Sequence, residues 1–543
     1  MGNRAINPAL TLAMALIVAP TLAGLGVTLA AAFGYLPALG RAGFSLDPWR
    51  RLLAEPGLWA SVRLTFGVGL ASTAVALALA LALLARKPPG GWALAALLAS
   101  PHSAIAVGLA FLLAPSGWLA RLFSPWATGW NAPPDLALVG DANGFALTLG
   151  LIVKETPFLL AVGAAALAQF PAEAQRRAAR ALGHGRGRAF ALIVAPQLYR
   201  RIRLPVFAVL AYGLGNVDMA LPLAPSHPAP LAVLALHWLL SPDLDDLFVG
   251  EAAAALQLGL TLVAALAWFG AEHGVGALGR ALARSGARGG GFDAALAAGA
   301  WAGGAALALG FAALAGMILW AFAWRWPFPL ALPQSWTLAI AMRESGRLAG
   351  PLATTAALGA ATSLASLALA VAWLESEQRG GQRAPVGAVC LPLLAPQIAF
   401  LFGMQTVLAS ARLDGTLLAV AWAHMLFVFP YLLLALADPY RALDSRYARA
   451  AAALGVGPNA ALWRIKLPLL RAPLALAFAI GFAVSAAQYL ATLFAGGGRV
   501  ATLTTEALAL AGGGDRRMSA LVGLSQTAAP FAVWLAALAA ARR

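Results

Sequence analysis

The sequence predicts an all-α integral membrane protein with about 12 transmembrane helices, arranged as two tandem halves of six helices each. Two observations predict this fold. Of 543 residues, 61% are hydrophobic and only 11% are charged, with a mean hydropathy of +0.80, which lies far from the composition of soluble globular chains. A segment of the first half also recurs 272 residues later, at about half the length of the chain.

Many mainly apolar runs are long enough to cross a membrane, since a helix needs about 20 residues to span a hydrocarbon core of roughly 30 Å. The first run is longer than the apolar core of a cleaved signal peptide, so we expect it to be a retained span. The predicted spans are 8–34, 64–85, 92–114, 145–168, 205–224, 252–271, 295–323, 351–373, 387–409, 415–436, 474–495 and 519–541.

The distribution of charge predicts that the N-terminus lies inside. With these spans, the inner segments carry 24 Arg and Lys against 7 Asp and Glu, whereas the outer segments carry 12 of each. The positive-inside rule accounts for this excess, so the net charge of +16 does not require a nucleic-acid partner. We interpret the outer acids Asp243, Asp245 and Asp246 as a solvated face rather than a cation site, and the single Cys390 as a packing residue.

The repeated segment lies on the inner side, between the fourth and fifth spans of each half. Residues 177–185, RAARALGHG, match residues 449–457, RAAAALGVG. Alanine and arginine favour helix and the glycines favour a break, so each copy is predicted to be a helix-turn-helix. One interpretation is an interfacial helix pair that meets anionic lipid; the other is a docking device used twice. The residues concerned are Arg177, Ala178, Ala179, Gly183, Gly185, Ile193 and Pro196, then Arg449, Ala450, Ala451, Gly455, Gly457, Ile465, Leu467 and Pro468.

The repeat predicts two homologous halves, residues 1–275 and 295–543, joined by a cytoplasmic linker at 276–294 that is rich in Gly and Arg. The chain contains no ATP-binding loop of the form Gly-x4-Gly-Lys-Ser/Thr, because Lys87, Lys154 and Lys466 are followed by Pro, Glu and Leu. We also find no paired-Cys or His-Glu-x-x-His metal motif. No cofactor, metal site or enzymatic activity is therefore predicted.

The second copy resembles the cytoplasmic EAA loop, Glu-Ala-Ala-x3-Gly-x9-Ile-x-Leu-Pro, of permease subunits in bacterial binding-protein-dependent ABC importers. Gly455, Ile465, Leu467 and Pro468 stand at the matching positions, whereas Arg replaces the Glu in both copies. The resemblance implies the type I ABC importer permease fold in the bacterial inner membrane. It also implies two copies of a cytoplasmic ABC ATPase, which dock on the two loops and hydrolyse ATP, and a periplasmic solute-binding protein.

Fusion of two permease halves in one chain is similar to the ferric-iron and thiamine class of these importers, and so is the stretch from Gln488 to Thr505. The whole pattern is most similar to the YnjC-type fused permeases. The resemblance does not supply the transported solute.

Five polar residues within predicted spans are candidates for the translocation path, because ionisable groups in a membrane usually face a cavity or a partner. They are Lys154, Glu155, Asn216, Asp218 and Gln488. The alternative is that they form structural links between helices, such as Lys154 with Asp218. An ion-coupled secondary transporter with two six-helix repeats is the rival function, but it does not explain the repeated helix-turn-helix.

Overall fold

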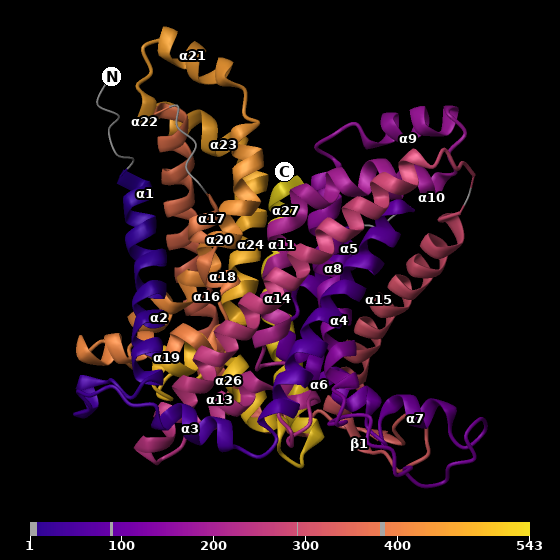
Figure 1. The fold of residues 1–543 in the computed structure, drawn as a ribbon, viewed down its shortest axis with the longest axis vertical. Coiled ribbons are helices and arrows are strands. Elements are labelled where there is room, and N and C mark those ends of the chain that lie inside the picture. Colours follow the sequence, from indigo (N-terminus) through magenta and orange to yellow (C-terminus); the bar gives the residue numbers. More distant parts are fainter. Residues whose placement is uncertain (1–7, 87–90, 290, 381–385, 543) are drawn as a thin grey trace.

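The computed structural model describes residues 8–86, 91–289, 291–380 and 386–542. Residues 1–7, Lys87 and residue 290 of the predicted linker lie outside this part of the chain. The described residues form a bundle of helices with a short two-stranded hairpin at one end (Figure 1). We call the end that carries α9, α10, α21 and α22 the inner end, and the end that carries α3, α7 and the hairpin the outer end.

The elements that precede residue 285 include one π-helical segment in the first span and another after α10. In chain order they are α1 (Pro8–Ala13), η1 (Met14–Val18), α2 (Ala19–Ala32), η2 (Pro37–Leu39), α3 (Asp47–Ala54), α4 (Leu58–Ala85), α5 (Gly91–Ala99), α6 (His102–Leu113), α7 (Trp118–Phe123), α8 (Phe145–Leu167), α9 (Ala172–Ala181), α10 (Arg186–Ala189), η3 (Phe190–Val194), α11 (Ala195–Gly215), α12 (Ala220–Leu223), α13 (Leu231–Leu239) and α14 (Leu244–Arg284).

The remaining elements include the antiparallel pair β1 and β2 and a π-helical segment after α22. They are α15 (Asp293–Phe322), β1 (Ala323–Arg325), β2 (Ser335–Trp336), α16 (Ala339–Gly380), α17 (Val386–Val389), α18 (Leu391–Leu394), α19 (Ile398–Ser410), α20 (Leu417–Arg441), α21 (Ser445–Ala453), α22 (Pro458–Ala461), η4 (Leu462–Lys466), α23 (Leu467–Leu469), α24 (Arg471–Ala486), α25 (Leu490–Gly496), α26 (Leu503–Ala511) and α27 (Arg516–Arg542).

The prediction of an all-α membrane protein is confirmed. Among the described residues, nine helices are long and apolar enough to cross a membrane, or ten if the bent pair 458–469 and 471–486 counts as one span. Four predicted spans differ from the continuous helices that we expected, because the third and fifth spans of each predicted half are broken. The breaks lie at 100–101, 216–219, 395–397 and 487–489. Pro101 and Pro396 account for the first and third breaks, since proline disfavours helical backbone in the residue before it.

The predicted linker is shorter in the structure than in the sequence analysis. Helix α14 continues to Arg284, so the predicted boundary at residue 275 falls inside a helix, and α15 begins at Asp293. Only residues 285–292 therefore join the two long helices.

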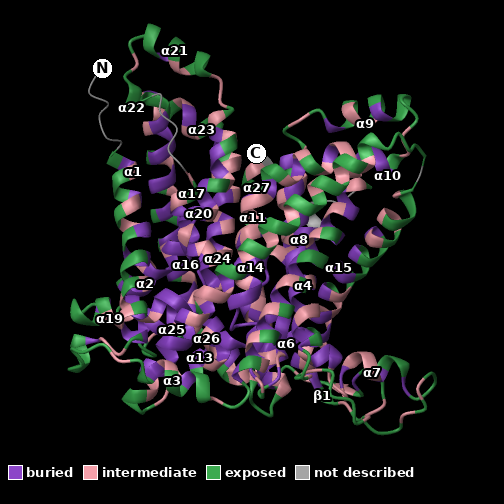
Figure 2. Cartoon of the chain, viewed as in Figure 1, coloured by how far each residue is buried: buried purple, intermediate pink, exposed green. Residues whose placement is uncertain are grey.

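The same three helices pack together in each predicted half. Helices α4, α8 and α11 contact one another in the first, and α16, α20 and α24 do so in the second. Figure 2 shows that buried residues fill the middle of the bundle, while exposed residues gather on α3, α7, α9 and α21 at its two ends. These three mutually packed helices form the centre of each half.

The first helix of each predicted half crosses to the other half. Helix α2 packs on α19, and α15 packs on α6. A glycine stands at each crossing. A Cβ atom on Gly403 would overlap the carbonyl oxygen of Gly24, and one on Gly108 would lie 2.7 Å from the carbonyl oxygen of Ala313. Small residues allow such close approach of helix backbones in membranes, so these glycines let the two halves interlock.

Charged side chains tie the outer loops together. Arg41 pairs with Asp245 at 2.6 Å, and Arg51 of α3 pairs with Asp246 at 2.7 Å. The carboxylate of Asp243 accepts a hydrogen bond from the Asp245 amide at the start of α14. The outer acids thus hold α3 against the start of α14.

We expect Gly403→Ala and Gly108→Ala to lower the stability of the folded chain, because each new methyl group would meet a backbone carbonyl. Overpacking of this kind costs about 1–3 kcal/mol. Gly26→Ala on α2 is the matched control, since nothing lies within 4 Å of the position that its new methyl group would take; we expect a change of at most about 1 kcal/mol there, in the stabilising direction. Thermal unfolding in detergent measures the difference. Equal unfolding temperatures for all three variants would contradict the glycine crossings.

Candidate functional site

The two repeated segments form the same helix-turn-helix at the inner end, as predicted. Helices α9 and α21 each end in a left-handed glycine, Gly183 with φ +85° and Gly455 with φ +75°. Each turn closes with the two hydrogen bonds of a Schellman motif. They join Gly183 N to Arg180 O (2.9 Å) and His184 N to Ala179 O (3.2 Å), then Gly455 N to Ala452 O (3.0 Å) and Val456 N to Ala451 O (2.9 Å).

The correspondence continues beyond the turn. Gly185 and Gly457 both begin a short helix, α10 and α22, from extended backbone. Each short helix runs into a π-helical segment, η3 and η4, at the same spacing of 272 residues. Ile193 and Ile465 lie in these π-helical segments, Pro196 lies at the start of α11, and Leu467 and Pro468 lie in α23.

Each turn presents one large apolar side chain. Leu182 is 64% exposed and Leu454, its counterpart, is 82% exposed. The alanines one turn earlier, Ala179 and Ala451, are buried. Each loop therefore packs its helix through small residues and leaves a leucine uncovered at its tip, which favours a docking surface over a fully packed hairpin.

The attachments of the two loops to the bundle differ. The first loop is bonded to the linker: Gly185 N donates to Gly289 O at 3.0 Å, and Gly289 N donates to Gly183 O at 3.3 Å. Asp293, at the start of α15, accepts a hydrogen bond from the Gly187 amide. The position of the first loop therefore depends on the segment that joins the two halves.

The second loop is held by a carboxylate at the inner end of α16. Lys466 of η4 donates to Glu375 at 2.7 Å and to Gln378 at 2.9 Å. Glu375 also accepts from Tyr440 at 2.6 Å and from Arg379 at 2.8 Å. A carboxylate with three donors around it is well compensated for burial, so it fixes α16, α20 and the second loop relative to one another.

Lys154 and Glu155 hold the two sides of the break in the third span. The ammonium group of Lys154 donates to the carbonyl oxygens of Leu97 (2.7 Å) and Ser100 (2.6 Å), at the end of α5. Glu155 lies 3.0 Å from the Nε2 atom of His102, at the start of α6. A cation at a helix C-terminus and an anion at an N-terminus are both favourable. This geometry favours the structural interpretation of Lys154, with α5 carbonyl groups as its partners in place of the predicted Asp218.

The breaks in the fifth spans carry matching amides. Asn216 and Gln488 are 272 residues apart, and both are buried. Each donates from its side-chain nitrogen to a backbone carbonyl, Gly213 O at 2.9 Å and Val484 O at 3.2 Å. The side-chain oxygen of each has no hydrogen-bond partner within the described residues. Two buried acceptors thus remain free at equivalent places.

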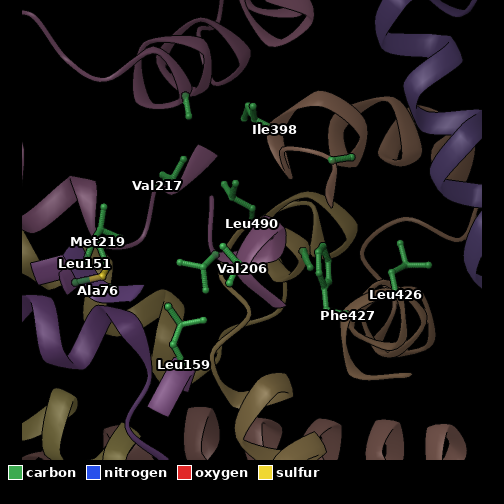
Figure 3. Packing of buried hydrophobic residues seen from close by; sticks show 14 of the residues in the cluster. Ala76, Leu151, Leu159, Val206, Val217, Met219, Ile398, Leu426, Phe427 and Leu490 are labelled. Carbon is green, nitrogen blue, oxygen red and sulfur yellow. The ribbon is translucent and has the colours of Figure 1, made fainter. Parts of the chain in front are cut away.

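Asp218 lies in the first of these breaks and accepts a hydrogen bond from Tyr212 at 2.8 Å. Tyr489, in the second break, lies within electrostatic range of Asp218. Figure 3 shows Val217, within the first break, and Leu490, directly after the second, in the same buried apolar cluster as Val206 and Phe427. The breaks of the two halves therefore meet in the interior of the bundle, and apolar side chains fill the space around them.

Several polar residues that the sequence analysis did not select belong to these groups. They are His102 and Tyr212, which contact the predicted acids, and Glu375, Tyr440 and Lys466. Glu251 is fully buried in α14, with the Thr28 side chain of α2 beside its carboxylate; it lies one residue before the span predicted at 252–271. In the part of the chain that the structure describes, no group of three His, Cys, Asp or Glu residues is placed to hold a metal ion.

Comparison with known proteins identifies a relative of nearly the same length. The chain is 31% identical over 500 residues to the inner membrane ABC transporter permease protein YnjC of Escherichia coli (strain K12), and the match covers 90% of this chain and 89% of that protein. No family model matches the chain.

We expect Lys154→Met to destabilise the fold by roughly 1.5–3 kcal/mol, because it leaves carbonyl groups at the end of α5 without their charged donor. Gln488→Leu is the comparison variant. It removes one neutral hydrogen bond, from the side-chain nitrogen to Val484 O, while the side-chain oxygen has no partner to lose, so we expect a change of about 0.5–1.5 kcal/mol. Thermal unfolding in detergent tests both. If Lys154→Met unfolds at the wild-type temperature, the structural assignment of Lys154 is wrong.

Proposed function

The chain belongs to the permease subunits of ABC transporters, and we propose that it is the importer type, with both permease halves fused in one polypeptide. It is a multi-pass protein of the bacterial inner membrane and a transport subunit rather than an enzyme, and it works with a partner ABC ATPase. In our proposal two ATPase copies dock at the inner end, on the loops 177–196 and 449–468.

One observation carries the docking proposal. The two loops repeat the same Schellman turn, exposed leucine and π-helical segment at a constant spacing, and both lie at the same end of the bundle (Figure 1). A loop structure that occurs twice in one chain is expected if two copies of the same partner bind to that chain. The interfacial-lipid interpretation does not require an exposed leucine at the same step of both turns.

The loops connect directly to the helices that would move. The first loop continues through η3 into α11, and the second meets α24 at a bend of 78°. Helices α11 and α24 both end at the breaks that carry Asn216 and Gln488. A displacement of a loop therefore reaches the interior of the bundle along one helix in each half. This connection would transmit ATP-driven motion to the translocation path.

We assign the translocation path to the meeting point of the two fifth-span breaks. Asn216 and Gln488 supply free acceptor oxygens. Asp218 lies in the same break as Asn216, and Glu155 is connected to Asp218 through His102 and Tyr212, whose rings lie 4.4 Å apart. Irregular backbone within a membrane is tolerated where it lines a cavity or is buried in protein, and substrate sites of tandem-repeat transporters lie at such breaks. Lys154 supports this path because it fixes the neighbouring break between α5 and α6. A periplasmic solute-binding protein would deliver the solute at the outer end.

The importer assignment also accounts for the absence of an ATP-binding loop from the sequence. The rival ion-coupled transporter would use Glu155 and Asp218 as ion sites, but it gives no role to the paired inner loops. Family membership favours the ATP-driven function.

We expect Gly455→Val to weaken ATPase binding by about 5- to 30-fold. A side chain in left-handed backbone costs roughly 1–2 kcal/mol, which corresponds to that range of affinity. Gly457→Val is the matched control, because Gly457 has φ −64° and nothing lies within 4 Å of its added side chain. Biolayer interferometry of detergent-purified chain with the ABC ATPases of its own genome measures the affinities.

The control should bind within about twofold of wild type. If wild type binds none of the ATPases, the docking proposal fails. If Gly455→Val and Gly457→Val bind equally well, the Schellman turn is not the docking element.

A further inference from the structure

The first loop and the linker border an open basic hollow at the inner end. The hollow has a volume of about 680 Å³ and lies between α9, its turn and the start of α15. Its charged and polar lining consists of Arg177, Arg180, Arg186, His184 and Asp293. Gly183, Gly185 and Gly289 complete the wall, so backbone as well as side chains faces the space.

The hollow is built by contacts and is not a gap between loose segments. The linker residue Gly289 exchanges backbone hydrogen bonds with both sides of the turn, at Gly183 and Gly185. Arg188, which is buried, donates to Leu282 O at 2.8 Å. The linker is therefore fixed to the loop from α14 through to α15.

The hollow has an excess of uncompensated positive charge. Among the described residues, no acid pairs with Arg177, Arg180 or Arg186, whereas the neighbouring Arg176 pairs with Glu173 at 3.6 Å. Asp293 is the one acid in the lining, and its carboxylate already accepts the Gly187 amide. Three guanidinium groups around one space favour carboxylate or phosphate oxygens, which they bind in a bidentate manner.

The second loop keeps only one of these groups. Arg449 corresponds to Arg177, but Ala452, Val456 and Pro458 stand where the first loop has Arg180, His184 and Arg186. Around its turn the second loop instead exposes three large side chains. These are Leu454 (82% exposed), Trp463 (70%) and Tyr447 (51%).

From this difference we infer that the two loops dock chemically different surfaces: the first binds an acidic segment of an ATPase subunit in the arginine hollow, and the second binds an apolar surface. The inference rests on the proposed docking function and specifies the partner chemistry at each loop. Charge complementarity identifies the occupant of the hollow. Each ATPase copy would then meet the permease in its own way, even if the two copies have the same sequence.

An anionic lipid headgroup has the same oxygen chemistry but fits the hollow less well. A bound phospholipid would need an apolar wall beside the headgroup for its acyl chains. The lining holds a single apolar side chain, Ala181. The exposed Leu182 belongs to the docking turn itself, so the hollow and the docking turn form one continuous surface.

The test compares two double variants of the full chain in detergent. Arg180→Gln with Arg186→Gln removes charge from the first loop, and Leu454→Gln with Trp463→Gln removes apolar surface from the second. Arg471→Gln is the control, because this exposed arginine at the start of α24 lies outside both docking loops. Gel filtration confirms that each variant is folded, and biolayer interferometry measures ATPase affinity at 50 mM and 300 mM NaCl.

We expect both double variants to bind at least tenfold more weakly than wild type at 50 mM NaCl. The arginine variant should lose a large part of the salt dependence of wild-type binding, because Arg177 is then the one arginine left in the lining of the hollow. The apolar variant should keep that salt dependence, and Arg471→Gln should bind within about twofold of wild type.

Three results would overturn the inference while leaving ATPase docking intact. The first is equal salt dependence in both double variants. The second is wild-type affinity in the arginine variant together with loss of co-purified anionic phospholipid, measured by mass spectrometry, which would assign the hollow to lipid. The third is a loss in Arg471→Gln as large as that in the arginine variant. Failure of wild type to bind any ATPase would instead defeat the proposed function.

Discussion

The hydrocarbon core of the membrane offers no water to unpaired backbone groups, and this constraint determines where the helices of this chain are interrupted. Three of the four breaks, and the π-helical segment of the first span, have a local hydrogen-bonding solution. The ammonium group of Lys154 occupies the carbonyl groups at the end of α5. The indole of Trp422 donates at 2.8 Å to Leu16 O, a carbonyl of the π-helical segment in the first span. Asn216 and Gln488 each donate to a nearby carbonyl in the fifth spans.

The same constraint distinguishes residues that satisfy the backbone groups of a broken helix from residues whose polar atoms remain free to bind a solute. The hydrogen bonds of the Lys154 ammonium group go to backbone oxygens, which is typical of a group that holds a broken helix. The amide oxygens of Asn216 and Gln488 have no partner among the described residues, although a buried acceptor without one is costly. The simplest explanation for two such acceptors at equivalent places is a solute or water that donates a hydrogen bond to each of them. The interlocked first helices and the glycine crossings keep these breaks together, since each half holds a helix of the other.

The features predicted well from the sequence are those set by local pattern. The apolar runs indicate membrane spans, and the glycines at 183 and 455 predict turns because left-handed backbone favours glycine. The broken spans were missed, since hydropathy averages across a break of two to four residues. The partners of Lys154, the contact between Glu375 and Lys466 and the closure of the linker on the first loop join residues 54, 91 and 104 positions apart. Contacts at such separations follow from tertiary packing, and no short motif in the sequence encodes them.

A single chain with two docking loops should hold two ATPase subunits, and the mass of its complex with the ATPase tests this most directly. Native mass spectrometry of the detergent-solubilised complex gives the number of ATPase subunits on each permease chain. We predict two ATPase copies for each copy of this 55.5 kDa chain. A complex that contains one ATPase for each chain, or one that requires two permease chains to hold an ATPase pair, would contradict the central claim that the two halves form a complete transmembrane unit.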